Sequence, residues 1–305
     1  ARNVFEHMLD KAPKEPDVLF ALGVLSLELE DLVAARDYFT QLRDTGERQG
    51  DSAYYLGQVE DLAENSEMAV SWYRKVEGEH SLDSRIRIAQ MRAEQGKVER
   101  AREILQQLRD QWPDDALTIY LIEAQILAEL DLLREAMAVY DEGVAAFPGD
   151  PDLLYARGLH ALGLNRLDIL ERDLKSILAN DPEHADALNA LGYSLADQTD
   201  RLDEARSYIE RALVLKPNDP AVLDSMGWLQ FRLGRPEQAV DYLRKALELT
   251  PDGEIAAHLG EVLWALGKRD EAWGTWEKAL AHDPAHEYLL RVIGRNRFYD
   301  SRPRP

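Results

Sequence analysis

Residues 220–249 read PAVLDSMGWLQFRLGRPEQAVDYLRKALEL, and this stretch decides the fold. It predicts a first helix, then a turn at Gly234, then a second helix that Pro236 opens at a position where proline is well tolerated. Apolar residues spaced by three and four place one stripe on the second helix. The stripe comprises Ala239, Leu243 and Ala246. The stretch therefore predicts two helices joined by a tight turn.

The same pattern recurs at intervals close to 34 residues. A small residue marks each first helix, with gaps of 34, 32, 35, 34, 34, 35, 33 and 34, at Gly23, Gly57, Ala89, Ala124, Gly158, Gly192, Gly227, Gly260 and Gly294. A second small residue follows in most units, at Ala35, Ala69, Ala101, Ala136, Ala205, Ala239 and Ala272. Leu170 stands there in the fifth unit. A proline closes six units, at Pro113, Pro148, Pro182, Pro217, Pro251 and Pro284. Self-similarity at a fixed period of this length indicates a helical repeat array.

These landmarks share one physical interpretation. Small residues at a crossing point allow two helices to pack closely, with axes about 8–10 Å apart. Proline ends the second helix because it lacks an N–H and clashes with the preceding turn. The pairs Asn218-Asp219 and Asn180-Asp181 are expected to cap the helices that follow them. The chain is therefore predicted to be a stack of antiparallel helix pairs.

These residues and spacings resemble the tetratricopeptide repeat (TPR) family over essentially the whole chain. Its Leu-Gly signature corresponds to Leu191-Gly192, Met226-Gly227 and Leu259-Gly260. Its central and later alanines correspond to Ala205, Ala239 and Ala272, and to Ala212, Ala246 and Ala279. The match is weaker in residues 50–114, where Ala89 replaces glycine. The resemblance implies an all-α, right-handed superhelical solenoid of antiparallel helix pairs.

The repeat register predicts the organisation of the chain. We expect a second helix of a truncated repeat in residues 1–13, because Ala1, Phe5, Met8 and Pro13 match Ala239, Leu243, Ala246 and Pro251. Eight helix pairs follow in residues 16–284, starting near residues 16, 50, 82, 117, 151, 185, 220 and 253. A capping helix and a basic tail occupy residues 287–305. The tail carries Arg291, Arg295, Arg297, Arg302 and Arg304 and is expected to be solvated, or to lie back on the array or mark a contact. A solenoid end without its neighbouring helix indicates a fragment of a longer array.

Members of the TPR family bind proteins on a concave wall lined by first helices. The resemblance implies that the late repeats place Asp186, Asn189, Tyr193 and Ala196, then Asp224, Trp228 and Phe231, then Glu254, Glu261 and Trp264 on this wall. The earlier repeats place Phe20, Val24, Tyr54, Gln58, Gln90, Leu121, Gln125, Tyr155 and Leu159 there. Aromatic side chains give a large contact area with few rotors to freeze, which suits a binding wall. The alternative for Trp228 and Trp264 is packing in the core. No lysine is in the set, so a lysine-based clamp for a carboxyl terminus is not expected.

The composition excludes several function classes. The 305 residues carry a formal net charge of −21, which repels nucleic acid and acidic lipid but attracts basic protein surfaces. Cysteine is absent, which excludes disulfides, thiolate nucleophiles and Cys-ligated zinc. The sequence holds no Gly-rich phosphate loop, no His-Glu-x-x-His and no Gly-x-Ser-x-Gly. His282 and His286 are separated by Pro284, which argues against a metal site. We therefore predict a chain that is not an enzyme and has no cofactor, metal site or direct membrane contact.

Two stretches resemble a narrower group of TPR proteins. Residues 223–228 (LDSMGW) and 256–264 (AAHLGEVLW) are similar to the carboxyl-terminal half of proteobacterial lipoproteins that present clients to a periplasmic carboxyl-terminal processing protease. The implied partners are that protease and its cell-wall hydrolase clients. The implied location is periplasmic, with an outer-membrane anchor on a lipidated segment upstream of Ala1. A cytoplasmic location is the alternative.

The leading hypothesis is therefore a non-catalytic scaffold or adaptor that holds partner proteins. Two alternatives stay open at this point. One is a regulatory TPR array within a larger enzyme, and the other is an assembly factor of a cell-envelope secretion or pilus complex. Self-association is compatible with each of the three.

Overall fold

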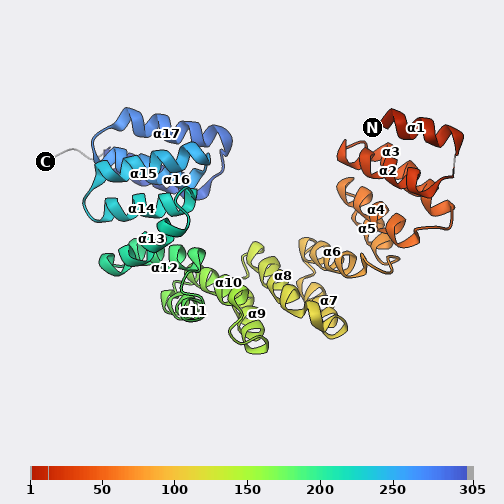
Figure 1. Cartoon of the computed structure of the whole chain (residues 1–305), viewed down its shortest axis with the longest axis horizontal. Coiled ribbons are helices and arrows are strands. Elements are labelled where there is room, and N and C mark those ends of the chain that lie inside the picture. Colours follow the sequence, from red (N-terminus) through yellow and green to blue (C-terminus); the bar gives the residue numbers. More distant parts are fainter. Residues whose placement is uncertain (1, 13, 301–305) are drawn as a thin grey trace. The chain divides into compact units, whose positions relative to one another are not determined.

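The computed structural model describes residues 2–12 and 14–300, and all regular structure within them is helical (Figure 1). The α-helices of the first part are α1 (Arg2–Lys11), α2 (Pro16–Glu28), α3 (Leu32–Asp44), α4 (Gln49–Leu62), α5 (Ser66–Tyr73), α6 (Ser81–Glu94), α7 (Val98–Gln111), α8 (Ala116–Glu129) and α9 (Leu133–Ala146). They are followed by α10 (Pro151–Gly163), α11 (Leu167–Asn180), α12 (Ala185–Gln198), α13 (Leu202–Leu215), α14 (Pro220–Arg232), α15 (Pro236–Leu249), α16 (Gly253–Ala265), α17 (Arg269–His282) and α18 (Glu287–Asp300). A short 3-10 helix, η1 (Pro113–Asp115), precedes α8.

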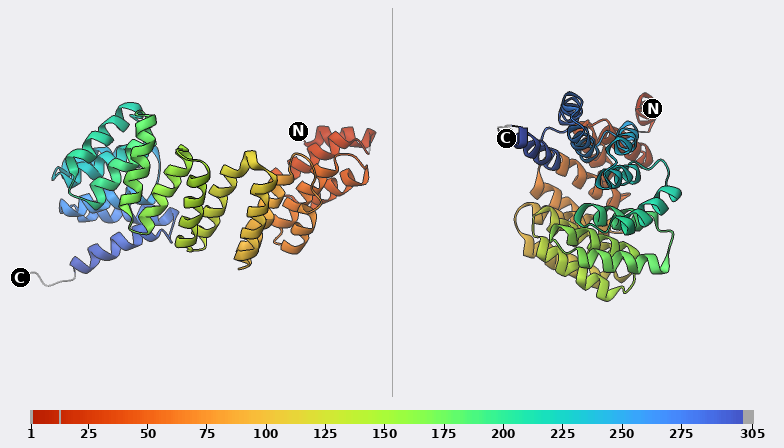
Figure 2. Two further views of the ribbon diagram at one scale, coloured as in Figure 1. Left: turned by 90° about the horizontal axis from the view of Figure 1, so that it is seen from below. Right: turned by 90° about the vertical axis from the view of Figure 1, so that its left-hand side faces the viewer.

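The helices belong to two compact units, Ala1–Val139 (unit 1) and Tyr140–Pro305 (unit 2). From α2 onward we call the even-numbered helices first helices and the odd-numbered ones second helices. Each first helix of unit 2 from α10 to α16 packs against the second helix that follows it, and α2, α4 and α6 do the same in unit 1. Figure 2 shows the paired helices as neighbouring rods. The predicted fold class, an all-α solenoid of antiparallel helix pairs, is confirmed.

The landmark glycines hold the pairs together by close approach. A Cβ built on Gly227 would lie 2.6 Å from Cγ of Leu243, and one on Gly57 would lie 2.5 Å from the ring of Tyr73. At Gly260 the same position meets the fully buried indole of Trp276. A large side chain of the second helix thus fills the space that each glycine leaves, as close packing of two helices requires.

Two landmarks depart from this arrangement. A Cβ on Gly158 would make only an ordinary contact, 3.5 Å from Cα of Leu170. This is the fifth unit, where leucine replaces the usual alanine of the second helix. At Gly294, in α18, an added Cβ would meet no described atom within 4 Å. The repeat interval therefore marks the position in the unit, but the packing at that position differs between units.

Capping residues fix where the late first helices begin. Oδ1 of Asp219 accepts hydrogen bonds from the backbone N–H groups of Ala221 and Val222, as predicted for Asn218-Asp219. The prediction for Asn180-Asp181 is wrong, because α12 starts later and is capped by Nδ1 of His184. The caps therefore fix the first residues of α12 and α14.

The first helices of unit 2 also pack on one another. Helix α12 contacts α14, α14 contacts α16, and α16 contacts α18. Their apolar residues join the second helices in continuous cores; the core of the last repeats includes Leu243, Leu259, Trp276 and Leu289. The first helices therefore form one layer that exposes a shared face.

At the two ends, parts of the sequence predictions can be compared with the structure. Arg295 lies 3.7 Å from Oε2 of Glu261, and the guanidinium of Arg291 lies 5.3 Å from the ring centre of Tyr288. Arg295 therefore contacts the array through α16, whereas Arg291 lies against a ring of its own helix, α18. Ala1, Pro13, Arg302 and Arg304 lie outside the described residues, as does the side chain of Arg297. Among the described helices, none is both long and apolar enough to cross a bilayer.

Candidate functional site

The structure brings together a polar cluster on four consecutive first helices of unit 2. Its centre is His258 of α16, a residue that sequence reasoning assigned no role and whose side chain is fully buried. Nδ1 of His258 lies 2.9 and 3.0 Å from the two carboxylate oxygens of Asp224 on α14. Its Nε2 lies 3.4 Å from the hydroxyl of Tyr193 on α12 and 3.2 Å from that of Tyr288 on α18. The Trp228 ring stacks on the imidazole at 4.5 Å.

The cluster has a definite proton arrangement. A carboxylate only accepts hydrogen bonds, so Nδ1 of His258 carries a proton and donates a hydrogen bond to Asp224. Burial opposes a charge on the imidazole, but the negative charge and hydrogen bond of Asp224, with Glu254 and Glu261 beyond, raise the pKa of His258 above its ordinary value. Burial raises the pKa of the Tyr193 hydroxyl, so it stays neutral. The neighbouring carboxylates therefore favour the protonated form of His258.

The expectation that Trp228 lies open on the wall is wrong, since only 7% of this residue is exposed. Its Nε1 donates to Oδ1 of Asp197, 3.2 Å away at the end of α12. Asp224 is equally buried. The physical reason is the direct stacking of first helices, which turns this part of the predicted wall into a contact between repeats. A role of Trp228 and Asp224 in binding stays a prediction.

Trp264 and Phe231 also lie against other aromatic rings. The Trp264 ring stacks on Trp276 at 5.7 Å and meets Trp273 edge-on at 6.3 Å, so much of it joins the core with α17. The ring of Phe231 lies 5.4 Å from that of Trp228. Both remain partly exposed. Packing is thus the main role that the structure gives these two rings.

Four predicted wall residues meet in a pocket of about 450 Å³ on the shared face of α12, α14 and α16. They are Asn189, Tyr193, Asp224 and Glu254. We call this site the acidic pocket; its other lining residues are Ala190, Asp219, Pro220, Ala221, Ser225, Thr250, Asp252 and Ile255. The lining combines apolar side chains with the carboxylates of Asp219, Asp224, Asp252 and Glu254. No lysine or arginine is among the described residues that line it.

The remaining predicted residues lie outside this pocket. Asp186 on α12 is exposed and accepts from Nζ of Lys216 at 2.7 Å. Glu261 faces Arg295, as described above. Tyr155 on α10 is half-buried and its ring centre lies 6.3 Å from that of His184. Gln125, in unit 1, is exposed and donates to Glu129. The structure therefore gathers only part of the predicted set.

Another pocket, of about 310 Å³, lies on first helices of unit 1. It is lined by Tyr54, Gln58, Asp61, Leu62, Tyr73, Asp83 and Arg87. Here Asp61 is paired, because Arg87 donates to both of its carboxylate oxygens at 2.6 and 3.0 Å. Tyr54 and Gln58 are members of the predicted wall. This pocket is therefore aromatic and internally ion-paired.

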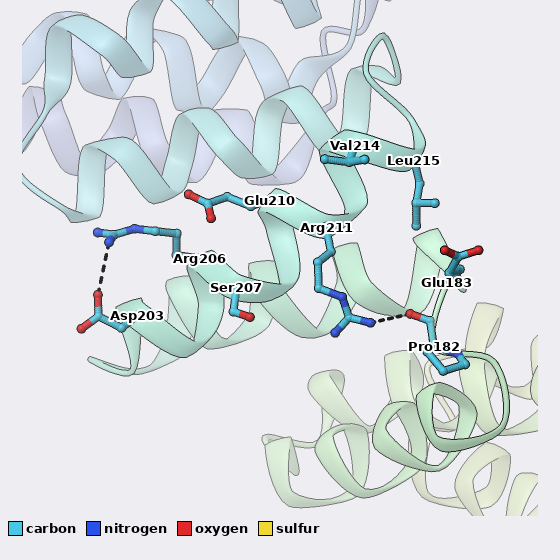
Figure 3. A pocket seen from close by; sticks show the side chains of 9 residues that line it. All are labelled: Pro182, Glu183, Asp203, Arg206, Ser207, Glu210, Arg211, Val214 and Leu215. Atoms are coloured by element: carbon cyan, nitrogen blue, oxygen red, sulfur yellow. Dashed lines mark hydrogen bonds and ion pairs between the residues drawn. The ribbon is translucent and has the colours of Figure 1, made fainter.

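A larger groove, of about 600 Å³, lies along second helix α13 (Figure 3). Its lining residues are Pro182, Glu183, Asp203, Arg206, Ser207, Glu210, Arg211, Val214 and Leu215. Figure 3 shows Arg211 donating to the carbonyl oxygen of Pro182 and Arg206 paired with Asp203. Acidic and basic side chains both line this groove, and no predicted wall residue lines it. Its α13 members all lie on one face of that second helix.

The sequence held a partial signal for the polar cluster. Asp224 and His258 are 34 residues apart, one more than the 33-residue interval from Gly227 to Gly260, so they occupy neighbouring register positions in successive repeats. Stacked first helices bring such positions together, and an acid followed by a histidine one repeat later indicates a pair. The partners Asp197 and Tyr288 required the actual helix spacing to be identified.

Comparison with known proteins adds three findings. Models of the tetratricopeptide repeat match residues 86–151, 155–220 and 194–264. TPR repeat-containing protein PA4667 of Pseudomonas aeruginosa is 41% identical over 213 residues, covering 69% of this chain and 36% of that protein. The chain thus spans about a third of the length of this relative.

Solved structures with similar folds are much more distant in sequence. A tetratricopeptide repeat protein from Parabacteroides merdae matches 92% of this chain and 98% of its own, with a TM-score of 0.60 and 16% identity. Yeast Tom70 matches 97% of this chain and 57% of its own, again with a TM-score of 0.60 and 16% identity. At such low identity the likeness concerns the fold alone.

Proposed function

The chain belongs to the tetratricopeptide repeat family, and from this premise we propose that it is a non-catalytic scaffold that holds partner proteins on its first helices. The observation that carries the proposal is the acidic pocket, a hollow shared by three successive first helices. A polypeptide that crosses several repeats gains contacts from each one. Among the described residues, no cluster of three or more histidine and acidic side chains has a geometry suited to a metal ion.

We further propose that the scaffold is an adaptor for a periplasmic carboxyl-terminal processing protease and delivers cell-wall hydrolases to it. The support is the resemblance of residues 223–228 and 256–264 to adaptors of this kind. The same resemblance supports a periplasmic location with a lipid anchor on an upstream segment. Fractionation of the host, with labelled fatty acid as tracer, tests this location, and recovery in the cytoplasm contradicts it.

Site-specific photo-crosslinking tests the scaffold and the adaptor together. A photoreactive amino acid replaces Ala221 in the acidic pocket of the full-length protein in its host, and mass spectrometry identifies the crosslinked proteins. The matched control places the same amino acid at Val214, which is 82% exposed on second helix α13. We expect the protease or its clients at Ala221 and not at Val214. Secretion or pilus proteins at Ala221 contradict the adaptor, and identical products at both positions contradict the first-helix wall.

A further inference from the structure

The polar atoms of the acidic pocket need hydrogen-bond donors. Its lining includes the carboxylates of Asp219, Asp224, Asp252 and Glu254, which only accept hydrogen bonds. Oδ1 of Asn189 is buried and has no hydrogen-bond partner among the described residues. A buried acceptor without a partner is costly, so a rearrangement of the Asn189 side chain that presents this oxygen to a donor on a guest would be favoured. The pocket therefore favours a guest that donates hydrogen bonds.

The charge of the pocket stays negative after its internal partners are counted. Asp224 faces His258, which cancels its charge when the imidazole is protonated. Asp219 and Asp252 each use Oδ1 to cap a helix whose N-terminus carries roughly half a positive charge. Glu254 receives only the neutral hydroxyl of Tyr193, at 3.3 Å. About two negative charges therefore remain.

The groove along α13 and the pocket of unit 1 lack this imbalance. In the groove along α13, Arg206 and Arg211 accompany the acids. In the pocket of unit 1, Arg87 pairs with Asp61. Among these three sites, only the acidic pocket is lined by carboxylates without a lysine or arginine. Its charge complements a cation.

The apolar lining limits which guest fits. Ala190, Pro220, Ala221 and Ile255 offer apolar contact beside the carboxylates. Arginine and lysine bury an aliphatic stem on such surfaces while the charged head reaches polar groups. A guanidinium also has several N–H donors in a fixed plane, which suits separate acceptors on several helices.

We propose that the acidic pocket binds an arginine or lysine side chain of a basic, extended segment of the partner protein. This inference rests on the proposed function, because it names the chemistry of the partner that the first helices hold. The segment would cross α12, α14 and α16. Its basic side chain would lie between the carboxylates and the side-chain oxygen Oδ1 of Asn189. Arginine is the better guest of the two.

Labelled peptides test the proposal by fluorescence anisotropy. The probes are alanine-based peptides of equal length that carry arginine, lysine, glutamine or glutamate at the same guest positions. We expect affinity to fall from arginine to lysine to glutamine, with the glutamate peptide weakest. Added salt should weaken the arginine peptide most, since charges at a partly exposed site are screened. Equal affinity of the arginine and glutamine peptides overturns the proposal.

Matched variants locate the binding. Glu254→Gln should weaken the arginine peptide about threefold, the size expected for one partly exposed ion pair. Glu210→Gln removes the same charge from the groove along α13 and should leave binding unchanged. Equal losses in the two variants overturn the assignment to the acidic pocket.

A second pair of variants tests occupancy. Ala221→Arg places a guanidinium at the pocket itself and should weaken the arginine peptide about tenfold, more than Ala221→Gln, which adds bulk without charge. Circular dichroism confirms that each variant is folded. If Ala221→Arg binds as well as the unchanged chain, the proposal fails. Crosslinks at Ala221 to a partner that lacks a basic segment would refute this inference while leaving the first-helix wall in place.

Discussion

Acidic residues on the first helices of the two units have different partners. In unit 1, Oε1 of Glu60 accepts from Arg36 at 2.6 Å, and Glu123 accepts from Arg102 at 3.1 Å and also from Arg109. In the late repeats of unit 2, Asp224 faces a histidine and Glu254 a tyrosine hydroxyl. The helix pairs are alike, yet one set of acids is neutralised by permanent cations and the other is not.

This difference shows what the repeat does and does not determine. The repeat determines where a side chain lies relative to the next helix. It leaves the charge at that position free to vary. Arginine cannot lose its proton in a protein, whereas histidine can. Glu60 and Glu123 of unit 1 are therefore paired with permanent cations, whereas Asp224 of unit 2 faces a histidine that can lose its proton and Glu254 faces a neutral hydroxyl.

The largest expected effect on stability comes from breaking a buried ion pair in unit 1. Glu123 is 2% exposed, so Glu123→Ala removes the buried acid that Arg102 and Arg109 share. The exposed Glu99 then remains 4.0 Å from Arg102. We expect a loss of about 3–5 kcal/mol in the free energy of unfolding, as for other buried pairs that lose one partner. Urea denaturation followed by circular dichroism measures it. A loss below about 1 kcal/mol would show that the arginines reach water easily.

Packing should be equally strict in the two units. Gly57→Ala and Gly227→Ala force a methyl group against Tyr73 and Leu243, and each should cost about 1–3 kcal/mol by overpacking. Gly158→Ala is the control, because its methyl group makes an ordinary contact and alanine favours helix. Thermal melting compares the three variants. If Gly158→Ala melts as low as the others, the close approach at the landmark glycines is not what matters.

Removing the acid in unit 2 should cost less than in unit 1. In Asp224→Asn, His258 can become neutral, so the variant avoids a buried charge and loses mainly a charged hydrogen bond, about 1.5–3 kcal/mol. Urea denaturation followed by near-ultraviolet circular dichroism measures this loss in the free energy of unfolding, since Trp228 stacks on His258. A loss as large as that of Glu123→Ala would contradict the contrast between the units.

The smallest effect is the pH dependence of unit 2. The pKa of His258 is raised in the folded chain, so its contribution to stability is fully present below about pH 6.5, the unfolded pKa of histidine. The contribution is lost as the pH rises through the folded pKa. Urea denaturation at several pH values should show this decline, and His258→Gln should remove it. A decline that persists in His258→Gln assigns the titration to another group.

Much of the fold follows from the sequence because small residues and prolines mark helix contacts and helix ends directly. Gly227 and Pro251 show this, whereas the fifth unit, with Leu170, shows that one landmark does not fix the packing. The site was harder to predict. Trp228 sits at a position expected to face the wall, but its burial depends on how closely α12 and α14 stack. His258 lies one register position beyond that of Asp224, and its two tyrosine partners come from helices two repeats before and one repeat after it.

Hydrogen–deuterium exchange of the chain with and without the arginine peptide tests the central claim most directly. The claim is that the first helices of unit 2 hold an extended basic segment over the acidic pocket. It predicts slower exchange in α12 and in the first turns of α14 and α16, with no change in α13. Protection confined to α13, or the same protection with the glutamine peptide, would contradict it.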